Sequence, residues 1–304
     1  MNGGAVPRWA QVLRYLAPPV GAACGVTVAL TFGNRTAPLW LTWAVLAVAA
    51  TTAAGLVCGY GLGRWQDLSK LCTIPAAWPV IWPVMALALV SLALMNVPLL
   101  LPPPHVTVSG GKGTGLGSGL VGMFAIVAAI PVATVMIGMW RAVGGEAPLG
   151  PKDAPFATKG AQLDALLELR RLLQRLLAAV GSVVALVAFT YSTWWLLERS
   201  LHTQFGSRPP QFVLIFGAFG STLVGLVYGP AWSALQRRGR LLRDTMFPLC
   251  EADQGPQIVS LAADRQTLEQ MLGLNRGFLA DLQSGLVILA PLLAGAVAAF
   301  LPHQ

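Results

Sequence analysis

The feature that most constrains this chain is a set of seven long apolar runs that carry almost no charge. They lie at residues 15–33, 38–63, 74–101, 117–140, 177–197, 211–235 and 279–301. A run of about 18 or more apolar residues is long enough to cross a bilayer as one helix. A helix also satisfies its own backbone hydrogen bonds, which a segment in lipid must do. The sequence therefore predicts an all-α fold, a polytopic transmembrane helical bundle of about seven helices.

The overall composition agrees with a membrane protein and excludes several other classes. Hydrophobic residues make up 55% of the chain and charged residues only 11%, whereas a soluble domain carries about 25% charged residues. This excludes an ordinary soluble enzyme, a disordered chain and a nucleic-acid-binding domain. The net charge of +8 is the excess expected when Lys and Arg are held in cytoplasmic loops. We therefore expect the lipid bilayer as a partner and no nucleic acid.

Lys and Arg are distributed unevenly over the segments between the runs. If each run crosses the membrane, the segments on the side of the N-terminus hold 16 of the 20 Lys and Arg residues, and the opposite segments hold 4. Because cytoplasmic loops carry such an excess, we expect a cytoplasmic N-terminus and an external C-terminus. The basic residues are 16 Arg and 4 Lys. Together with abundant Ala and Gly, this favours a GC-rich bacterial genome and the bacterial plasma (inner) membrane.

Tryptophans fall near the ends of several runs. They are Trp40, Trp43, Trp194 and Trp195 at the outer ends, and Trp65, Trp78, Trp140 and Trp232 at the inner ends. An indole is apolar with one N–H donor and prefers the level of the lipid headgroups. The pattern predicts aromatic belts at both membrane surfaces.

The Gly- and Pro-rich stretch 141–160 is typical of a linker and divides the chain into two units. The first, 1–140, is a four-helix transmembrane unit, with Pro18 and Pro19 expected in the first turn of its first helix. The second, 161–304, is a three-helix transmembrane unit with helical extensions into the cytoplasm at 161–176 and 236–276.

Periodicity defines these extensions. Leucines at helical spacing predict one helix of 37 residues over 161–197, and the sixth run continues as a helix that stops near Pro248. A third cytoplasmic helix is expected at 260–272, with Ser260 as its N-cap and Gly273 as its C-terminal stop. The apolar faces of the three pieces should pack together as a small cytoplasmic domain.

Residues that carry chemistry are scarce in the runs. None of the runs has an ionisable residue near its centre, and Glu198 and Asp281 lie only at run ends. This argues against a proton-coupled carrier, which needs charge inside the membrane. His105, His202 and His303 all fall in outer segments, and no metal-ligand motif occurs. We expect no enzyme, no catalytic residue, no metal site and no cofactor.

Small residues at four-residue spacing form the strongest positive signal. One ridge lies in the second run and another in the sixth; their members are Gly55, Gly59 and Gly63, and Gly217, Ser221, Gly225 and Gly229. Such ridges let helix backbones approach closely. The favoured interpretation is packing inside one bundle, and the alternatives are a subunit interface or a pore-lining face.

The sixth run also holds a candidate hinge and a basic cluster. Pro230 follows Gly229 where the membrane part of the helix meets its extension, and proline can kink a helix. The cluster below it consists of Arg237, Arg238, Arg240 and Arg243. Three interpretations stay open: a positive-inside anchor, a salt-bridge face against acidic residues of neighbouring helices, and a site for an anionic ligand or partner.

Two segments of the second half suggest a family. The segments Leu169–Leu177 (LRRLLQRLL) and Ser284–Leu293 (SGLVILAPLL) resemble uncharacterised multi-pass membrane proteins of actinobacteria. The resemblance covers roughly 161–301, rests on Leu- and Gly-rich motifs, and implies no known activity. Small multi-pass proteins of this build also act as membrane effectors in bacterial antiviral defence, beside a cytosolic sensor. That is an analogy of architecture only.

These observations favour a homo-oligomeric channel, pore or membrane effector that is gated through its cytoplasmic helices. A cytosolic protein or a small anionic ligand is the expected partner of those helices. The alternatives are a carrier for an uncharged or hydrophobic substrate and a membrane accessory subunit with no transport of its own.

Overall fold

The computed structural model describes residues 8–33, 39–71, 78–100, 114–145, 158–200, 211–248 and 255–275. These residues form seven helices and no strand, so the predicted all-α fold is confirmed for them. The helices are α1 (Arg8–Phe32), α2 (Trp40–Leu71), α3 (Trp78–Leu100), α4 (Thr114–Gly144), α5 (Lys159–Ser200), α6 (Gln211–Met246) and α7 (Gly255–Leu272).

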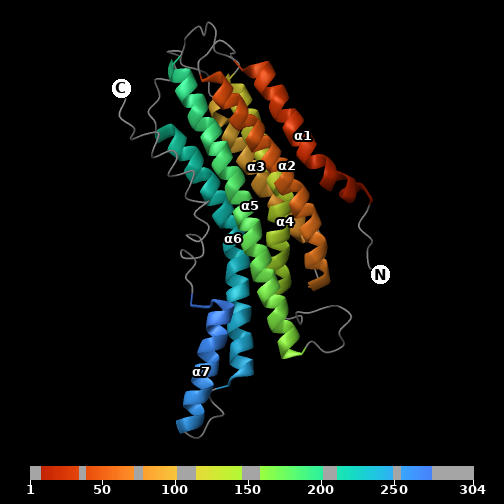
Figure 1. Cartoon of the computed structure of the whole chain (residues 1–304), viewed down its shortest axis with the longest axis vertical. Helices are drawn as coiled ribbons and strands as arrows, with labels where there is room; N and C mark the ends of the chain where they lie inside the picture. The colour runs from red at the N-terminus through yellow and green to blue at the C-terminus, as the bar shows by residue number, and fades with distance from the viewer. Residues whose placement is uncertain are drawn as a thin grey trace.

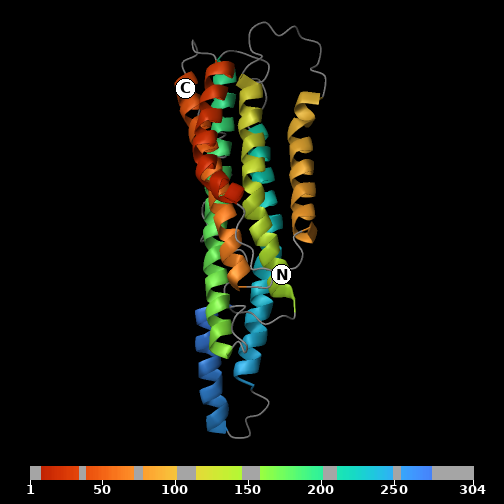
Figure 2. The same ribbon diagram turned by 90° about the vertical axis from the view of Figure 1, so that its right-hand side faces the viewer.

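The helices are arranged as an elongated bundle with a projecting end. α1 to α6 run side by side, and α5 and α6 continue past the others to one end of the molecule, where α7 lies beside α6 (Figure 1). We call residues 159–176 of α5, 236–246 of α6 and all of α7 the stalk. α3 stands at one side, next to α4 (Figure 2).

The seven helices of the structure do not all correspond to the seven predicted crossings. Six predicted runs fall in α1 to α6, α7 is one of the predicted extensions, and the run 279–301 lies outside the described residues. Four helical segments are long and apolar enough to cross a membrane: Gln11–Phe32, Trp40–Ser69, Leu116–Gly144 and Lys159–Ser200. A shorter apolar helix covers Pro79–Ala93. A helical bundle compatible with a membrane protein is therefore established, while seven crossings and the orientation stay predictions.

The structure has one long helix over the predicted range 161–197, extended to Lys159–Ser200, and it ends α6 at Met246, close to the predicted stop near Pro248. α5 is one helix of 42 residues and α6 one of 36, which correspond to about 63 Å and 54 Å at 1.5 Å per residue. Both exceed a hydrocarbon core of about 30 Å. α7 begins at Gly255, so Ser260 lies inside the helix and its predicted role as N-cap is wrong. Gly273 has φ 57° directly after α7, which confirms it as the stop.

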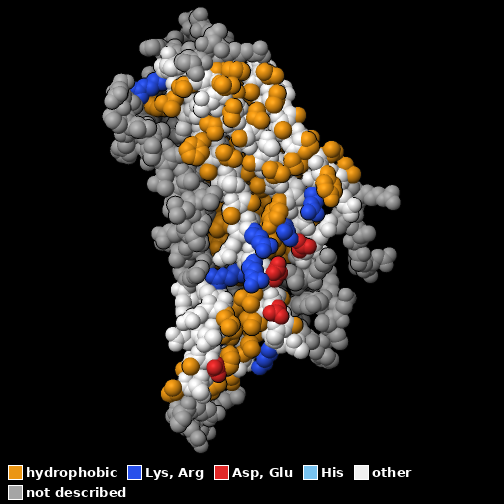
Figure 3. Space-filling model, in the orientation of Figure 1, with side chains coloured by type: hydrophobic (Ala, Val, Ile, Leu, Met, Phe, Trp, Pro, Cys, Tyr) orange, Lys and Arg blue, Asp and Glu red, His pale blue; other side chains and the backbone are white. Residues whose placement is uncertain are grey.

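One hydrophobic core connects the bundle with the stalk. It includes Val132 and Met136 of α4 and the buried stalk residues Leu169, Leu242 and Leu268. The periodic leucines of α5 form its inner face, and the polar positions between them are exposed or half-buried. The stalk is therefore packed onto the bundle as a continuation of it. On the face shown in Figure 3, hydrophobic side chains cover the bundle, and most of the charged side chains gather toward the stalk.

Three of the tryptophans predicted for the outer belt are covered by neighbouring helices. Trp43, Trp194 and Trp195 are buried inside the bundle, and the Nε1 atom of Trp43 donates a hydrogen bond to the Oγ atom of Ser118 at 3.0 Å. These three residues fill the end of the bundle between helices, and their level relative to the lipid headgroups stays a prediction. Trp140 does have an exposed ring, which lies beside the guanidinium of Arg141.

Candidate functional site

The small-residue ridge of α2 packs against α1. A methyl group added at Gly59 would lie 2.6 Å from the carbonyl oxygen of Arg14, and one at Gly55 would collide with the carbonyl of Ala17. At Gly63 it would lie 3.1 Å from the Arg14 guanidinium carbon. The two backbones therefore approach closely, as small residues allow. This ridge makes a contact within one chain.

Two prolines shape α1 at the same contact. Pro18 and Pro19 lie inside α1, which begins at Arg8, so their predicted position in the first turn is wrong. Pro18 has no N–H to donate to the carbonyl of Arg14, its partner in a regular helix. That carbonyl is the one that faces Gly59. A glycine Cα–H close to a carbonyl can make a weak hydrogen bond, which suits a carbonyl without its helical donor.

The small residues of the α6 ridge do not all face the same surroundings. Gly217 is buried, and Ser221 and Gly229 are half-buried, but a methyl group at Gly225 would meet no described atom within 4 Å. The close approach to α5 is made instead by Gly220, where a methyl group would lie 2.8 Å from a methyl carbon of Val184. The sequence pattern missed Gly220 because it is out of register with the ridge. The Gly225 side of α6 is not covered by any described helix.

The candidate hinge lies inside an unbroken helix. α6 continues through Pro230, although proline removes the hydrogen bond to the carbonyl of Leu226. The hydroxyl of Ser233 donates to the carbonyl oxygen of Pro230 at 2.8 Å. On either side of the proline, Tyr228 and Ala231 are both 1% exposed. The helix around Pro230 is thus fixed by the packing of Tyr228 and Ala231, although it lacks the backbone hydrogen bond to the carbonyl of Leu226.

The structure separates the four arginines of the basic cluster. Arg243 donates to the carboxylates of Asp244 at 2.8 Å and of Glu269 at 2.5 Å, and Arg265 of α7 also pairs with Asp244. Arg237 and Arg240 are exposed, and Arg238 is half-buried with a partner of its own. The salt-bridge interpretation therefore describes Arg243. The exposed pair remains accessible to a ligand.

The charge of Arg243 is secured by its partners. Burial lowers the pKa of its guanidinium, but the hydrogen bonds and the negative charges of Asp244 and Glu269 outweigh that effect, and the pKa is raised above its usual value. The side chain is therefore always positive. It joins α6 to α7 with a charge-assisted contact across the stalk.

The end of α7 is held by two residues that the sequence pattern did not single out. Arg170 of α5 donates from Nη2 to the carbonyl of Gly273 at 3.3 Å, and Gln236 of α6 donates from Nε2 to the same carbonyl at 3.5 Å. Leu274 lies against Gly239 of α6. The Oε1 atom of Gln236 is buried without a hydrogen-bond partner among the described residues. Local sequence carries no signal for this cap, because Arg170 is about a hundred positions from Gly273.

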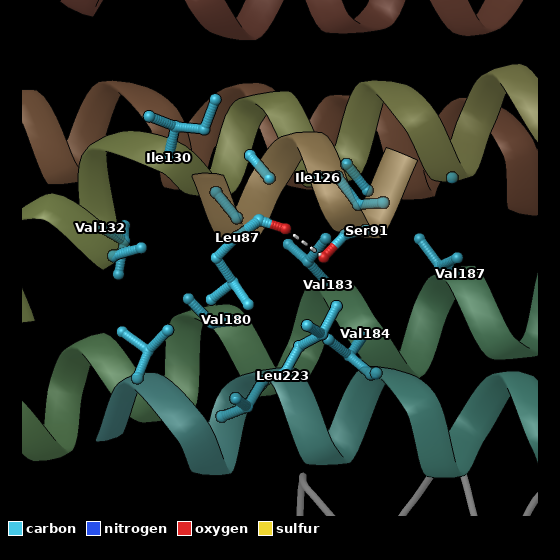
Figure 4. Close-up of a pocket in the computed structure, with 18 of the residues that line it drawn as sticks. Leu87, Ser91, Ile126, Ile130, Val132, Val180, Val183, Val184, Val187 and Leu223 are labelled. Atoms are coloured by element: carbon cyan, nitrogen blue, oxygen red, sulfur yellow. Dashed lines mark hydrogen bonds between the residues drawn. The ribbon is translucent and has the colours of Figure 1, made fainter. Parts of the chain in front are cut away.

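An apolar cavity of about 160 Å³ lies between α3, α4, α5 and α6. Leu87 and Ser91 line it from α3, Ile126 from α4, Val184 from α5 and Leu223 from α6 (Figure 4). The hydroxyl of Ser91 donates to the carbonyl of Leu87 in its own helix at 2.7 Å, so it offers no hydrogen to an occupant. Such a lining does not hold water.

A buried carboxylate, that of Glu198, lies near the C-terminal end of α5, away from the stalk. Glu198 is 2% exposed, and its Oε1 atom accepts a hydrogen bond from the Nε1 atom of Trp194 at 3.1 Å. The sequence placed this residue only at the end of a run. Its burial depends on neighbours that meet in the folded bundle, and it has further contacts beyond this bond.

The fold and these contacts define an all-helical bundle with four helices fit to cross a membrane and a stalk of three packed helices. Comparisons with protein-family models, with curated proteins and with solved structures found no match.

Proposed function

We propose that the protein is a multi-pass protein of the bacterial plasma membrane, with a cytoplasmic N-terminus, that acts as a homo-oligomeric channel or membrane effector. The stalk is the regulatory part. The observation that carries the proposal is that α5 and α6 each pass without interruption from the apolar bundle into the stalk. A displacement in the stalk is then a displacement of the same helices in the bundle.

The stalk offers two kinds of contact to a cytosolic partner or a small anionic ligand. Arg237 and Arg240 are exposed cations, and Arg243 holds α7 through Glu269. An anion that binds better when Arg243 is released shifts the stalk toward the released state, because a ligand moves an equilibrium only by its difference in affinity. Pro230, which lies between the stalk and the apolar part of α6, is the candidate point of bending.

Self-association is proposed through the uncovered side of α6. Gly225 has open space beside it in the described part of the chain, and neighbouring Leu226 is 58% exposed. A small residue next to an exposed apolar one permits close approach of a second helix. The α2 ridge is already used inside the chain and is not proposed as a subunit interface.

The test is ion flux in planar bilayers with two variants that divide the basic cluster. Arg243→Gln breaks the contact with α7, and the pair Arg237→Gln with Arg240→Gln removes only exposed charge. We expect the first to change the open fraction without ligand and the second to weaken the response to a cytosolic activator. Gly225→Leu should reduce oligomer size in nanodiscs, with Gly119→Leu as a control because that site is also open. Absence of current in every variant, at verified insertion, contradicts the channel.

A second candidate is a carrier for an uncharged or hydrophobic substrate. The specific observation that favours it is the apolar cavity among α3 to α6. A carrier shows saturable counterflow of labelled substrate and no unitary current. A non-transporting accessory subunit shows neither, so the two assays separate the three roles.

A further inference from the structure

The cavity among α3 to α6 is partly open and is bordered on one side by a weakly packed helix. Among the described helices, α3 packs mainly on α4, and Figure 2 shows it standing apart from the rest of the bundle. Its Val84, Leu87 and Ser91 line the cavity opposite Val184 of α5 and Leu223 of α6. The inner face of α3 is therefore shared between α4, where Val84 is buried in the core, and the cavity.

The position of the cavity decides what can fill it. Its lining covers 122–136 of α4 and 180–191 of α5. The first lies in the middle of the segment Leu116–Gly144, and the second lies in the part of Lys159–Ser200 beyond the stalk; both segments are fit to cross a membrane. At that depth the surrounding medium is hydrocarbon. The lining is apolar apart from Ser91 and Tyr191, and the Ser91 hydroxyl is engaged in its own helix. Water is thus disfavoured and hydrocarbon is available.

We infer that the cavity is a binding site for a segment of one acyl chain of a phospholipid from the surrounding bilayer. The volume of about 160 Å³ is close to the roughly 150 Å³ of an apolar cavity that binds a benzene-sized group, so it suits a short part of the chain. An empty space of that size leaves its lining without dispersion contacts. An inserted acyl chain restores these contacts and joins α3 to α5 and α6. The site concerns a resident lipid and stands independently of the proposed channel.

Exposed apolar residues on the outer surfaces of α3 and α6 serve as the comparison for the residues that line the cavity. Leu89 and Val90 of α3 are 60% and 56% exposed, and Leu226 of α6 is 58% exposed. In a bilayer these side chains touch bulk lipid, which exchanges freely and is removed by detergent. A chain held in the cavity is retained. The two populations can therefore be separated by washing.

The experiment uses the full chain in vesicles that contain a phospholipid with a diazirine in the middle of one acyl chain. The protein is extracted and washed with detergent, then irradiated, and the adducts are mapped by mass spectrometry. We expect adducts at Leu87 and Val184 and loss of adducts at Leu89 and Leu226. Adducts that are lost from all four positions, or that persist equally at all four, would overturn the inference.

Two variants establish that the cavity itself retains the lipid. Ala129→Phe fills it from α4, and Ala218→Phe adds the same ring at an exposed position of α6. We expect the adducts to disappear in the first and to remain in the second. Ala133→Leu is a milder filling variant, to be used if Ala129→Phe is not monodisperse. Full retention of lipid in a folded filling variant also overturns the inference.

The remaining occupant to test is the chain's own apolar run 279–301, which lies outside the described residues. Ser91→Cys is combined with Ala290→Cys after replacement of the native cysteines. We expect no rapid disulfide on mild oxidation. Quantitative formation of that disulfide within one chain would assign the cavity to the protein itself and overturn the lipid site.

Discussion

The carbonyl oxygen of Arg14 on α1 faces Gly59 on α2 so closely that a methyl group at residue 59 would lie 2.6 Å from it. Real Cβ atoms essentially never lie under 3.0 Å from a heavy atom outside their own residue and its neighbours in the helix. Because the obstacle is backbone rather than a flexible side chain, one helix must move to admit any larger residue. The pairing of α1 with α2 therefore depends on glycine at this position.

Gly59→Ala should destabilise the bundle by about 1–3 kcal/mol, the usual effect of overpacking. Gly225→Ala should instead raise the free energy of unfolding of the bundle by about 0.5–1 kcal/mol, because there is space for a methyl group at residue 225 and alanine is the better helix former. The measurement is thermal unfolding of the monomer in one detergent for both variants, because Gly225 is open only within a single chain. Equal loss of stability would contradict the difference in packing between the two ridges.

Removing either partner of the Arg243–Glu269 pair should loosen α7. Both side chains are about one-fifth exposed, so we expect a coupling of about 0.5–1 kcal/mol in a double-mutant cycle of Arg243→Gln and Glu269→Gln. This coupling free energy is measured from the rates of amide hydrogen exchange in α7 of the wild type, the two single variants and the double variant. Arg240→Gln is the control, since that residue is exposed. If Arg240→Gln loosens α7 to the same extent, the effect is general electrostatics rather than this pair.

Gly273→Ala should release the end of α7. The residue has φ 57°, which costs a side chain about 1–2 kcal/mol, and the new methyl would also collide with the Arg170 guanidinium. We expect faster hydrogen exchange over the last turn of α7. Because Arg170 also donates to the carbonyl of Gly273, the collision is separated by comparing Arg170→Ala with the double variant Arg170→Ala, Gly273→Ala. The second change should still speed exchange in that background, because the backbone strain remains, and no effect there would exclude the strain at residue 273.

Ser118→Ala should cost about 1–3 kcal/mol, because it leaves the buried indole N–H of Trp43 without its acceptor. Ser91→Ala is the matched control. Ser91 is also a buried serine, but among the described residues its hydroxyl bonds to the carbonyl of Leu87 in its own helix, and such bonds add little. Chemical unfolding of the two variants should therefore differ. A larger loss for Ser91→Ala would contradict this account.

The predicted topology has its own test. A cysteine placed in 103–112 should react with an impermeant thiol reagent added to intact cells, and one placed in 150–158 should not, because the excess of Lys and Arg predicts that the second segment is cytoplasmic. A permeant reagent should label both. The reverse pattern contradicts the orientation of seven crossings.

The sequence alone predicted the helical class and the extents of several helices. Apolar runs, leucine spacing and Gly273 act within one helix or its end, so α5, the stop near Pro248 and the end of α7 followed from local pattern. The start of α7 did not, because an N-cap such as Ser260 competes with a helix that continues past it.

Tertiary structure alone decided which helices meet. Two similar glycine ridges have different surroundings, since Gly59 faces α1 and Gly225 faces open space among the described residues. Trp43 is bonded to Ser118, which lies 75 positions away, and Arg243 is paired with Glu269, which lies 26 positions away. Arg237 belongs to the same basic cluster but is exposed. Helical periodicity shows which residues share a face of one helix. The same periodicity does not show which other helix covers that face. That partner is decided by close packing in three dimensions.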